Sequence, residues 1–266
     1  MKTDIADVVI VGAGAIGCAI AYFLSKEGVK VVVVEKDSLG SHASGFAPGS
    51  LNPTRLSPET MALLLSLSWE SFQMHRVLSQ ELNEEVGIDY HFCPSARIIL
   101  AFTEAEATEF RSLVDSQQKQ GFKVYWLDRD AVLSLENRVS PEVIGAVHSE
   151  DGAELDSYQY VLTLAQAAEK YGAEIRHGEV IGLKRNGTKV TAVQLSSGDI
   201  GCERVILAMG PWSGLASSWL GFTIPVTPQR GQVLRMQVSG APFPYTLYWA
   251  NHYITQTRHD GLIYTG

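Results

Sequence analysis

Residues 7–35 read DVVIVGAGAIGCAIAYFLSKEGVKVVVVE and carry the strongest structural signal in the chain. The β-branched run Asp7–Val11 is typical of a buried parallel strand, and it leads directly into a complete G-x-G-x-x-G motif at Gly12–Gly17. An apolar stretch with helical spacing follows at Cys18–Leu24, and Lys30–Val34 predicts a second strand that ends at Glu35. The pattern indicates a βαβ unit that binds a dinucleotide.

Each position of the motif has a physical role in such a unit. Gly12 permits the tight turn out of the strand, Gly14 lets the backbone approach a diphosphate, and Gly17 lets the helix lie against the sheet. The free N–H groups at the helix start face the diphosphate. Glu35 is placed to accept both ribose hydroxyls of an adenosine, and its charge repels a 2′-phosphate, which disfavours NADP.

The motif alone does not separate FAD from NAD, because both cofactors bind through their ADP half. An NAD-type fold would continue with further β–α units, whereas Ser38–Gly49 is a loop of small residues. Small side chains over that length suit a backbone that lies against an extended ligand, although an ordinary flexible loop has the same composition.

The rest of the chain mixes helices and strands. Ser57 and Pro58 predict a capped helix start, and the Thr103–Glu106 capping box predicts another. The expected helices end at Gly87, at Gly121 and, for the segment beginning at Asp156, at Tyr171; the expected strands are Arg97–Phe102, Lys123–Leu127 and Val143–His148.

Three alternating segments then predict an antiparallel meander. They are Glu179–Arg185, Thr188–Leu195 and Ile200–Leu207, with Asn186-Gly187 and Ser197-Gly198 as the hairpin turns. The third segment runs on to Ala208-Met209-Gly210. NAD dehydrogenases are not ordinarily built this way.

Composition excludes several classes of protein. Of the 266 residues, 45% are hydrophobic and 19% charged, which suits a globular protein with a sizeable core. The net charge of −8 and the lack of a Lys/Arg cluster argue against nucleic-acid binding, and the apolar runs are too short for a transmembrane segment. Three scattered cysteines without a CxxC pair favour a reducing compartment, so we expect a cytoplasmic protein without a disulfide framework or a metal site.

Further motifs carry a family resemblance. They are Ser44-Gly45 to Gly49, the block Ala208–Ser213, the block Pro225–Gln232, Tyr253-Ile254 and Asp260–Ile263. With the βαβ unit, this series resembles the FAD-dependent amine and amino-acid oxidoreductases of the D-amino acid oxidase superfamily, the group with glycine oxidase and sarcosine oxidase. The resemblance runs from about Asp7 to the last residue.

The resemblance implies an α/β fold. A Rossmann-type FAD-binding domain with a three-stranded β-meander is expected to be interleaved with an α+β substrate domain built on an antiparallel sheet. Residues 1–84 and 148–222 are assigned to the FAD-binding domain, and residues 85–147 and 223–266 to a truncated substrate domain.

The resemblance also implies site residues. The positions expected to bind FAD are Gly12, Gly14, Ala15, Ile16, Gly17, Glu35, Lys36, Ser44, Gly45, Gly49, Val180, Ala208, Gly210 and Trp212. Tyr253 matches a tyrosine that holds the substrate carboxylate in glycine oxidases, and Tyr248 and Arg230 are further candidates with weaker support. Tyr253 is also compatible with an ordinary half-buried strand tyrosine. Non-covalent FAD is expected, because Phe46 rather than His42 matches the attachment position of the dimethylglycine dehydrogenase relatives.

One departure from the family pattern limits the assignment. Family members continue for roughly another hundred residues, which supply an arginine that clamps the substrate carboxylate; the sequence is therefore expected to be a fragment, or to be completed by another chain. No catalytic residue is assigned. In this class a neutral amine transfers its Cα hydride to flavin N5 and leaves an imine, so a dedicated acid or base is not required.

Three functional hypotheses follow. The first is an FAD-dependent oxidoreductase that acts on the C–N bond of an amino acid or secondary amine of the glycine, sarcosine, D-amino acid or proline type. The second is a 2-hydroxy-acid or glycerol-3-phosphate dehydrogenase-like enzyme, and the third is a truncated, non-catalytic FAD-binding module. A nicotinamide dehydrogenase is a more distant alternative. A homo-oligomer, a partner subunit and a peripheral membrane location with a quinone acceptor stay open.

Overall fold

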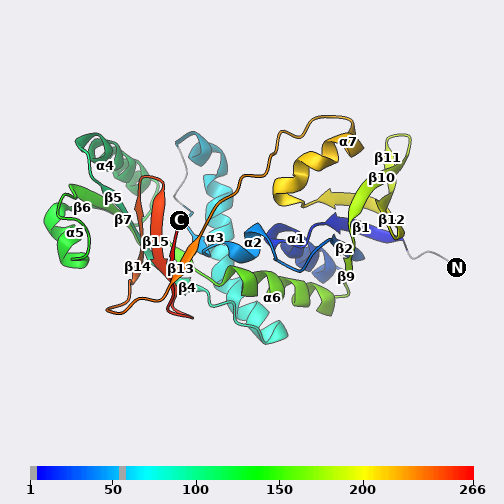
Figure 1. Ribbon diagram of the computed structural model, residues 1–266, viewed down its shortest axis with the longest axis horizontal. Helices are drawn as coiled ribbons and strands as arrows, with labels where there is room; N and C mark the ends of the chain where they lie inside the picture. The colour runs from blue at the N-terminus through cyan, green and yellow to red at the C-terminus, as the bar shows by residue number, and fades with distance from the viewer. Residues whose placement is uncertain (1–4, 54–57) are drawn as a thin grey trace. The chain divides into compact units, whose positions relative to one another are not determined.

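The computed structural model describes residues 5–53 and 58–266 and divides into two compact units. Unit 1 comprises Met1–Ala47, Gln80–Tyr90 and Ser157–Arg230; unit 2 comprises Pro48–Ser79, His91–Asp156 and Gly231–Gly266. Each unit contains its own large sheet (Figure 1). The domain boundaries expected from the sequence stay a prediction.

The sheet of unit 1 combines a parallel part with an antiparallel meander. Its strand order is β10-β11-β12-β1-β2-β9. The bounds are β1 (Ala6–Val11), β2 (Val31–Glu35), β9 (Glu174–His177), β10 (Val180–Asn186), β11 (Lys189–Leu195) and β12 (Gly198–Leu207). Strands β12, β1, β2 and β9 are parallel neighbours. Strands β10, β11 and β12 form the antiparallel meander that the sequence predicted.

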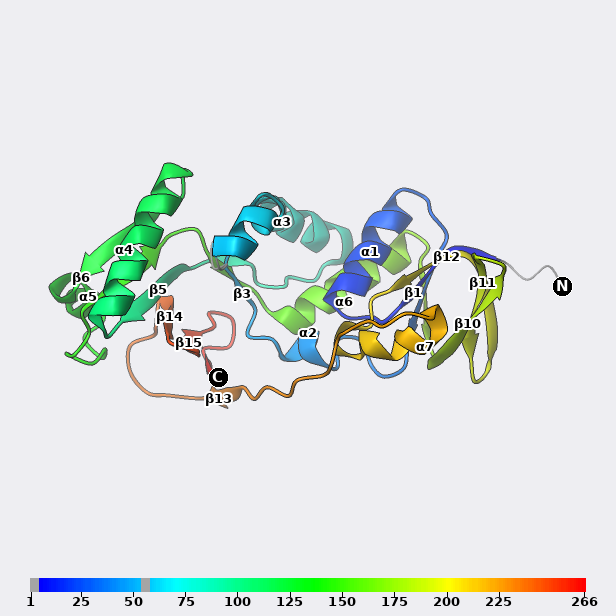
Figure 2. The same ribbon diagram turned by 90° about the horizontal axis from the view of Figure 1, so that it is seen from above.

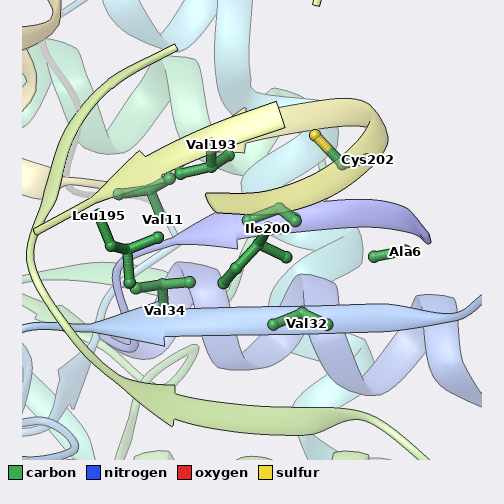
Figure 3. Close-up of a cluster of buried hydrophobic side chains, with 9 residues drawn as sticks. Ala6, Val11, Val32, Val34, Val193, Leu195, Ile200 and Cys202 are labelled. Atoms are coloured by element: carbon green, nitrogen blue, oxygen red, sulfur yellow. The ribbon is translucent and has the colours of Figure 1, made fainter. Parts of the chain in front are cut away.

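Valine-rich strands supply the core of unit 1. Side chains from β1 and β2 meet side chains from β11 and β12 in one buried cluster (Figure 3). Its members are Ala6, Val9, Val11, Val32, Val34, Val193, Leu195, Ile200 and Cys202. Burial on both faces explains why β1 and β2 are continuous apolar runs rather than alternating ones. The meander therefore closes one face of the parallel part with apolar side chains.

Two helices of unit 1 pack along one another: α1 (Ala15–Lys26) and α6 (Ser157–Lys170) (Figures 1 and 2). Their buried faces are rich in small residues, Gly17 and Ala21 on α1 and Ala165 and Ala168 on α6. Small side chains let two helix backbones approach closely. Unit 1 also contains three short helical segments, α2 (Ala43–Phe46), η1 (Gly210–Ala216) and α7 (Ser217–Leu220).

Unit 2 is built on a sheet with the order β13-β16-β15-β14-β5-β7-β6. The bounds are β5 (Ala96–Ala101), β6 (Val124–Asp128), β7 (Gly145–Ser149), β13 (Leu234–Met236), β14 (Tyr245–Trp249), β15 (His252–Gln256) and β16 (Ile263–Thr265). The expected antiparallel sheet is confirmed with one refinement, since β14 and β5 run parallel. Helices α4 (Glu104–Lys119) and α5 (Arg129–Leu135) pack against β6 and β7.

Two smaller features complete unit 2. A three-stranded sheet joins β3 (Ser50–Leu51), β8 (Ala153–Glu154) and β4 (Cys93–Pro94). Helix α3 (Pro58–Val86) begins in unit 2 and ends in unit 1. The predicted cap at Ser57 lies outside the described residues. The capping box of α4 is confirmed: the Glu106 N–H donates to Thr103 Oγ1 at 3.2 Å, and the Thr103 N–H donates to the Glu106 carboxylate at 3.0 Å.

The structure corrects the expected course of the chain in several places. The loop of small residues at Ser38–Gly49 contains the one-turn helix α2, and α5, η1 and β9 were not predicted at all. These elements are short, so their local hydrophobic period is too brief to be recognised. Among residues 5–53 and 58–266, the structure has no helix both long enough and apolar enough to cross a bilayer.

Candidate cofactor site

Close backbone packing shapes the turn between β1 and α1. Gly12 has φ +106°, and a Cβ there would lie 2.4 Å from the carbonyl oxygen of Ala208. A Cβ on Gly17 would lie 1.9 Å from the carbonyl oxygen of Gly12. Both neighbours are main-chain atoms, which a side-chain movement cannot relieve. The turn therefore lies directly against the end of β12, and α1 begins immediately beside it.

The N-terminus of α1 opens without a capping side chain, because its N-cap is Gly14. The N–H of Ala15 donates to the hydroxyl of Ser44 at 3.0 Å. That hydroxyl lies 3.0 Å from where a Cβ of Gly14 would be. The first turn of a twelve-residue helix carries unpaired N–H groups and the positive end of the helix dipole. This end of α1 is therefore suited to an anion, with Ser44 beside it.

Glu35 ends β2 with its carboxylate held in place by two backbone groups. The N–H of Ala13 donates to Oε2 at 2.8 Å, and the N–H of Asp37 donates to Oε1 at 2.9 Å. A carboxylate has four lone-pair positions, so both oxygens can still accept further hydrogen bonds. Glu35 therefore offers an oriented acceptor pair beside the glycine turn.

These features surround a cavity of about 330 Å³ within unit 1. It is lined by most of the predicted cofactor residues: Gly12, Gly14, Ala15, Ile16, Glu35, Lys36, Ser44, Val180, Ala208, Gly210 and Trp212. They come from the β1–α1 turn, the end of β2, helix α2, the start of β10 and the segment after β12. Five segments of the chain thus form one concave surface.

Three of the predicted positions do not line the cavity: Gly17, Gly45 and Gly49. A Cβ on Gly45 would lie 2.1 Å from the carbonyl oxygen of Gly40, and one on Gly49 would lie 1.8 Å from that of Leu155. In this structure their lack of a side chain serves close packing of the chain. Their role as cofactor ligands stays a prediction.

Other lining residues were not among the predicted ligands, and two of them, Glu179 and His42, carry titratable side chains. Of these two, His42 also has a ring contact with Trp212. It sits where the chain enters α2, a turn that the sequence did not predict. The small-residue composition of the loop was the available signal, and it did not single out this position.

Behind the cavity, Cys18 is buried on α1. Burial, followed by the nearby Glu35 carboxylate, raises the pKa of its thiol to about 12. Cys18 is therefore a neutral packing residue at ordinary pH rather than a nucleophile.

The two predicted substrate tyrosines lie in unit 2, opposite each other on neighbouring antiparallel strands. Tyr248 of β14 pairs with Tyr253 of β15, and their ring centroids are 6.3 Å apart. The Tyr248 hydroxyl accepts a hydrogen bond from Asn52 Nδ2 at 2.8 Å and lies 3.1 Å from Ser50 Oγ. Burial, followed by the neighbouring Tyr248, raises the pKa of Tyr253. Both rings therefore belong to one polar cluster that also contains Ser50 and Asn52.

Arg230, the third substrate candidate, is exposed and belongs to unit 1. It lies on the stretch after α7, where residues 225–233 form no helix or strand. Its proposed contact with a substrate stays a prediction.

The fold and the glycine turn agree with a comparison against protein families. The model of the FAD dependent oxidoreductase family, DAO, matches residues 7–266. The chain belongs to this family. The resemblance stated from the sequence is thereby confirmed, and FAD is the cofactor of the family. Relatives of this DAO chain include oxidases of amino acids and amines.

Individual relatives show how much of their length this chain spans. It is 28% identical to the glycine oxidase of Bacillus subtilis over 97% of this chain and 68% of that protein. It is 30% identical to the glycine oxidase of Geobacillus kaustophilus over 90% of this chain and 62% of that protein. The crystal structure of glycine oxidase from Bacillus cereus matches with a TM-score of 0.87 and 31% identity, over 98% of this chain and 70% of that one. The chain thus spans about two thirds of the length of these relatives.

The residues of the cavity fit FAD. The uncapped start of α1, the bare backbone at Gly14 and the oriented Glu35 carboxylate provide N–H donors for a diphosphate and acceptors for a ribose. All three line the same cavity of one unit.

Proposed function

We propose that the cavity of unit 1 binds FAD non-covalently and that the chain serves the oxidation of the C–N bond of an amino acid or secondary amine. The observation that carries this proposal is the convergence of the glycine turn, the N-terminus of α1 and Glu35 on one cavity. The substrate types we propose are glycine, sarcosine, D-amino acids and proline, and the relatives named above support the first of them.

Specific residues would hold each part of the cofactor. The N–H of Ile16 and the Ser44 hydroxyl, which accepts the N–H of Ala15, would bind the diphosphate, and Glu35 would accept the adenosine ribose hydroxyls. The start of β10 at Val180 would border the adenine, and Ala208, Gly210 and Trp212 would form the second cofactor-binding turn. Non-covalent binding is proposed because Phe46, rather than His42, stands at the attachment position of the dimethylglycine dehydrogenase relatives.

When bound, FAD supplies a hydride acceptor for the substrate α-carbon, which converts the amine into an imine that water hydrolyses. The protein's role is to orient the substrate and to exclude solvent from the site. We propose that Tyr253 and Tyr248 donate hydrogen bonds to a substrate carboxylate. The raised pKa of Tyr253 supports this role, because a neutral phenol donates a proton where a phenolate would repel the carboxylate.

The proposal also covers the cellular location of the chain and its partners. A cytoplasmic location is proposed because the three cysteines are unpaired in the structure. We propose a homo-oligomer or a partner subunit for the chain, because one of its relatives, a sarcosine oxidase of Rhodobacter capsulatus, is named as a β subunit.

The test is anaerobic mixing of the FAD-loaded chain with a substrate panel of glycine, sarcosine, proline, D-alanine, a 2-hydroxy acid and glycerol 3-phosphate. The proposal predicts loss of the oxidised-flavin absorbance with at least one amine and with neither alcohol. Reduction by an alcohol alone would contradict it. Bound FAD that no compound reduces would favour a binding module, and gel filtration would then show whether the chain is monomeric.

A further inference from the structure

Four side chains form a cluster at the rim of the cavity: Lys36, Asp37, His42 and Trp212. The Lys36 ammonium lies 4.7 Å from the centroid of the Trp212 ring, a cation–π distance. The His42 ring meets the same indole edge-on, with centroids 4.7 Å apart and an interplanar angle of 61°. Trp212 thus holds both basic side chains, and all three of these residues line the cavity.

His42 has a second contact, with Asp37. Its Nε2 lies 2.7 Å from Asp37 Oδ2, and the two side chains are 42% and 47% exposed. This hydrogen bond is the main cause of the lowered pKa of Asp37, which keeps the carboxylate ionised at neutral pH. A contact this exposed contributes little stability, because water competes for both partners. Breaking the hydrogen bond with Asp37 therefore costs little free energy, and His42 can bind an anion of higher charge instead.

The charges around the cavity favour such an exchange. Among the described residues that line it, the charged or titratable side chains are Glu35, Glu179, Lys36 and His42. Glu35 already accepts two backbone hydrogen bonds, and His177 contributes to the field at Asp37 from the end of β9. A dinucleotide would bring two negative charges to a cavity whose basic side chains are Lys36 and His42 alone. His42 is therefore the second basic side chain, beside Lys36, that can face these charges.

We propose that His42 binds the diphosphate of the dinucleotide by releasing Asp37, and that this exchange makes cofactor affinity depend on pH. This role rests on the proposed position of FAD in the cavity. Trp212 acts as a positioning residue, because its ring limits where His42 and Lys36 lie. Protonated His42 donates from both ring nitrogens, whereas neutral His42 offers one donor and no charge.

The test is equilibrium binding of FAD, ADP-ribose and adenosine to the full chain at about pH 6 and about pH 8. A diphosphate substituted at both ends does not titrate in this interval, so ADP-ribose isolates the protein's contribution. We expect FAD and ADP-ribose to bind roughly three- to tenfold tighter at the lower pH, the usual scale of a charged hydrogen bond at an exposed site. Adenosine, which lacks the diphosphate, is expected to bind equally at both pH values.

Variants of His42 separate the effect of its charge from a purely structural role. His42→Gln is expected to lose the pH dependence and to bind as the wild type does at the higher pH. His42→Arg is expected to bind tightly at both pH values, which a purely structural role for His42 would not produce. The matched control is His252→Gln, an exposed histidine on β15 of unit 2, which is expected to keep the wild-type pH dependence.

Two results would overturn the role of His42: wild-type affinity for ADP-ribose that does not change with pH, or His42→Gln with the wild-type pH dependence. A wild-type chain that binds neither FAD nor ADP-ribose at either pH would overturn the position of the cofactor as well. The failure of the His42 proposal is thus distinguishable from the failure of the cavity assignment.

Discussion

The cavity of unit 1 is walled mainly by backbone and small side chains, whereas the tyrosine cluster of unit 2 is made of hydroxyl and amide side chains. In unit 1, consecutive residues of one turn, Gly12 to Ile16, form one continuous part of the wall. In unit 2, Tyr248 meets Asn52, a residue 196 positions away in the sequence. Atoms supplied by a contiguous motif are placed by local geometry, while the tyrosine cluster depends on strand register and on a distant segment. The two regions should therefore respond differently to substitution.

The largest effect is expected for Gly17→Val. Its Cβ would lie 1.9 Å from the main-chain oxygen of Gly12, so α1 would have to move away from β1. We expect a loss of about 3 kcal/mol or more in the free energy of unfolding, measured by urea denaturation, together with loss of FAD binding. The control is Gly201→Val in the same unit, where a Cβ would make an ordinary 3.5 Å contact with Ile5. Equal stability of the two variants would show that the turn is not tightly packed.

Gly14→Val separates binding from folding. The nearest atom to its Cβ is the Ser44 hydroxyl at 3.0 Å, which can rotate away. We expect a near-wild-type unfolding midpoint but FAD binding weakened by more than about tenfold, or 1.4 kcal/mol, because the valine would cover the first N–H groups of α1. Unchanged affinity in a fluorescence titration would place the diphosphate elsewhere.

Both variants concern positions that could be assigned from the sequence, because strand, glycine motif, helix and acid are contiguous. The meander was likewise predictable, since Asn186-Gly187 and the turn before Gly198 mark its hairpins. The contacts of His42, and the link between Tyr248 and Asn52, were not predicted. The first depends on one turn of helix in a loop of small residues, and the second on a contact between β14 and the residue after β3, which no local pattern encodes.

Glu35→Ala should have a smaller effect on the same cavity. It removes the acceptors proposed for the ribose, and we expect FAD affinity to fall by about 1–3 kcal/mol, the range for hydrogen bonds to a charged group. Because Glu35 also accepts the N–H groups of Ala13 and Asp37, a modest loss of stability is expected alongside. Glu174→Ala, an exposed residue of β9 paired with Arg176, is the control and should bind FAD normally. Wild-type affinity in Glu35→Ala would remove Glu35 from the site.

Tyr248→Phe tests unit 2. It deletes a buried hydroxyl that accepts from Asn52, so we expect a loss of about 1 kcal/mol in the free energy of unfolding. FAD affinity should not change, because the cavity is lined by residues of unit 1. Tyr253→Phe should cost less, because Tyr253 is only partly buried. A Tyr248→Phe variant that loses FAD binding but not stability would show that the two regions are not independent.

The smallest effect concerns the thiols. Burial raises the pKa of Cys18 to about 12 and also raises that of Cys202, so both stay protonated at neutral pH. Cys93 of unit 2 is partly exposed, and alkylation of the native protein followed by mass spectrometry should find it modified first. Raising the pH to about 9 should leave Cys18 unlabelled, since its raised pKa keeps the thiolate population low. Labelling of Cys18 at the rate of Cys93 would contradict the packing of α1.

The most direct test of the cofactor site is a titration of the purified chain with FAD and, in parallel, with NAD, followed by fluorescence. We expect saturable binding of FAD and no response to NAD. We expect FAD binding to be lost only in variants of the cavity. A chain that binds NAD in preference, or that binds FAD unchanged after Gly14→Val, would contradict it.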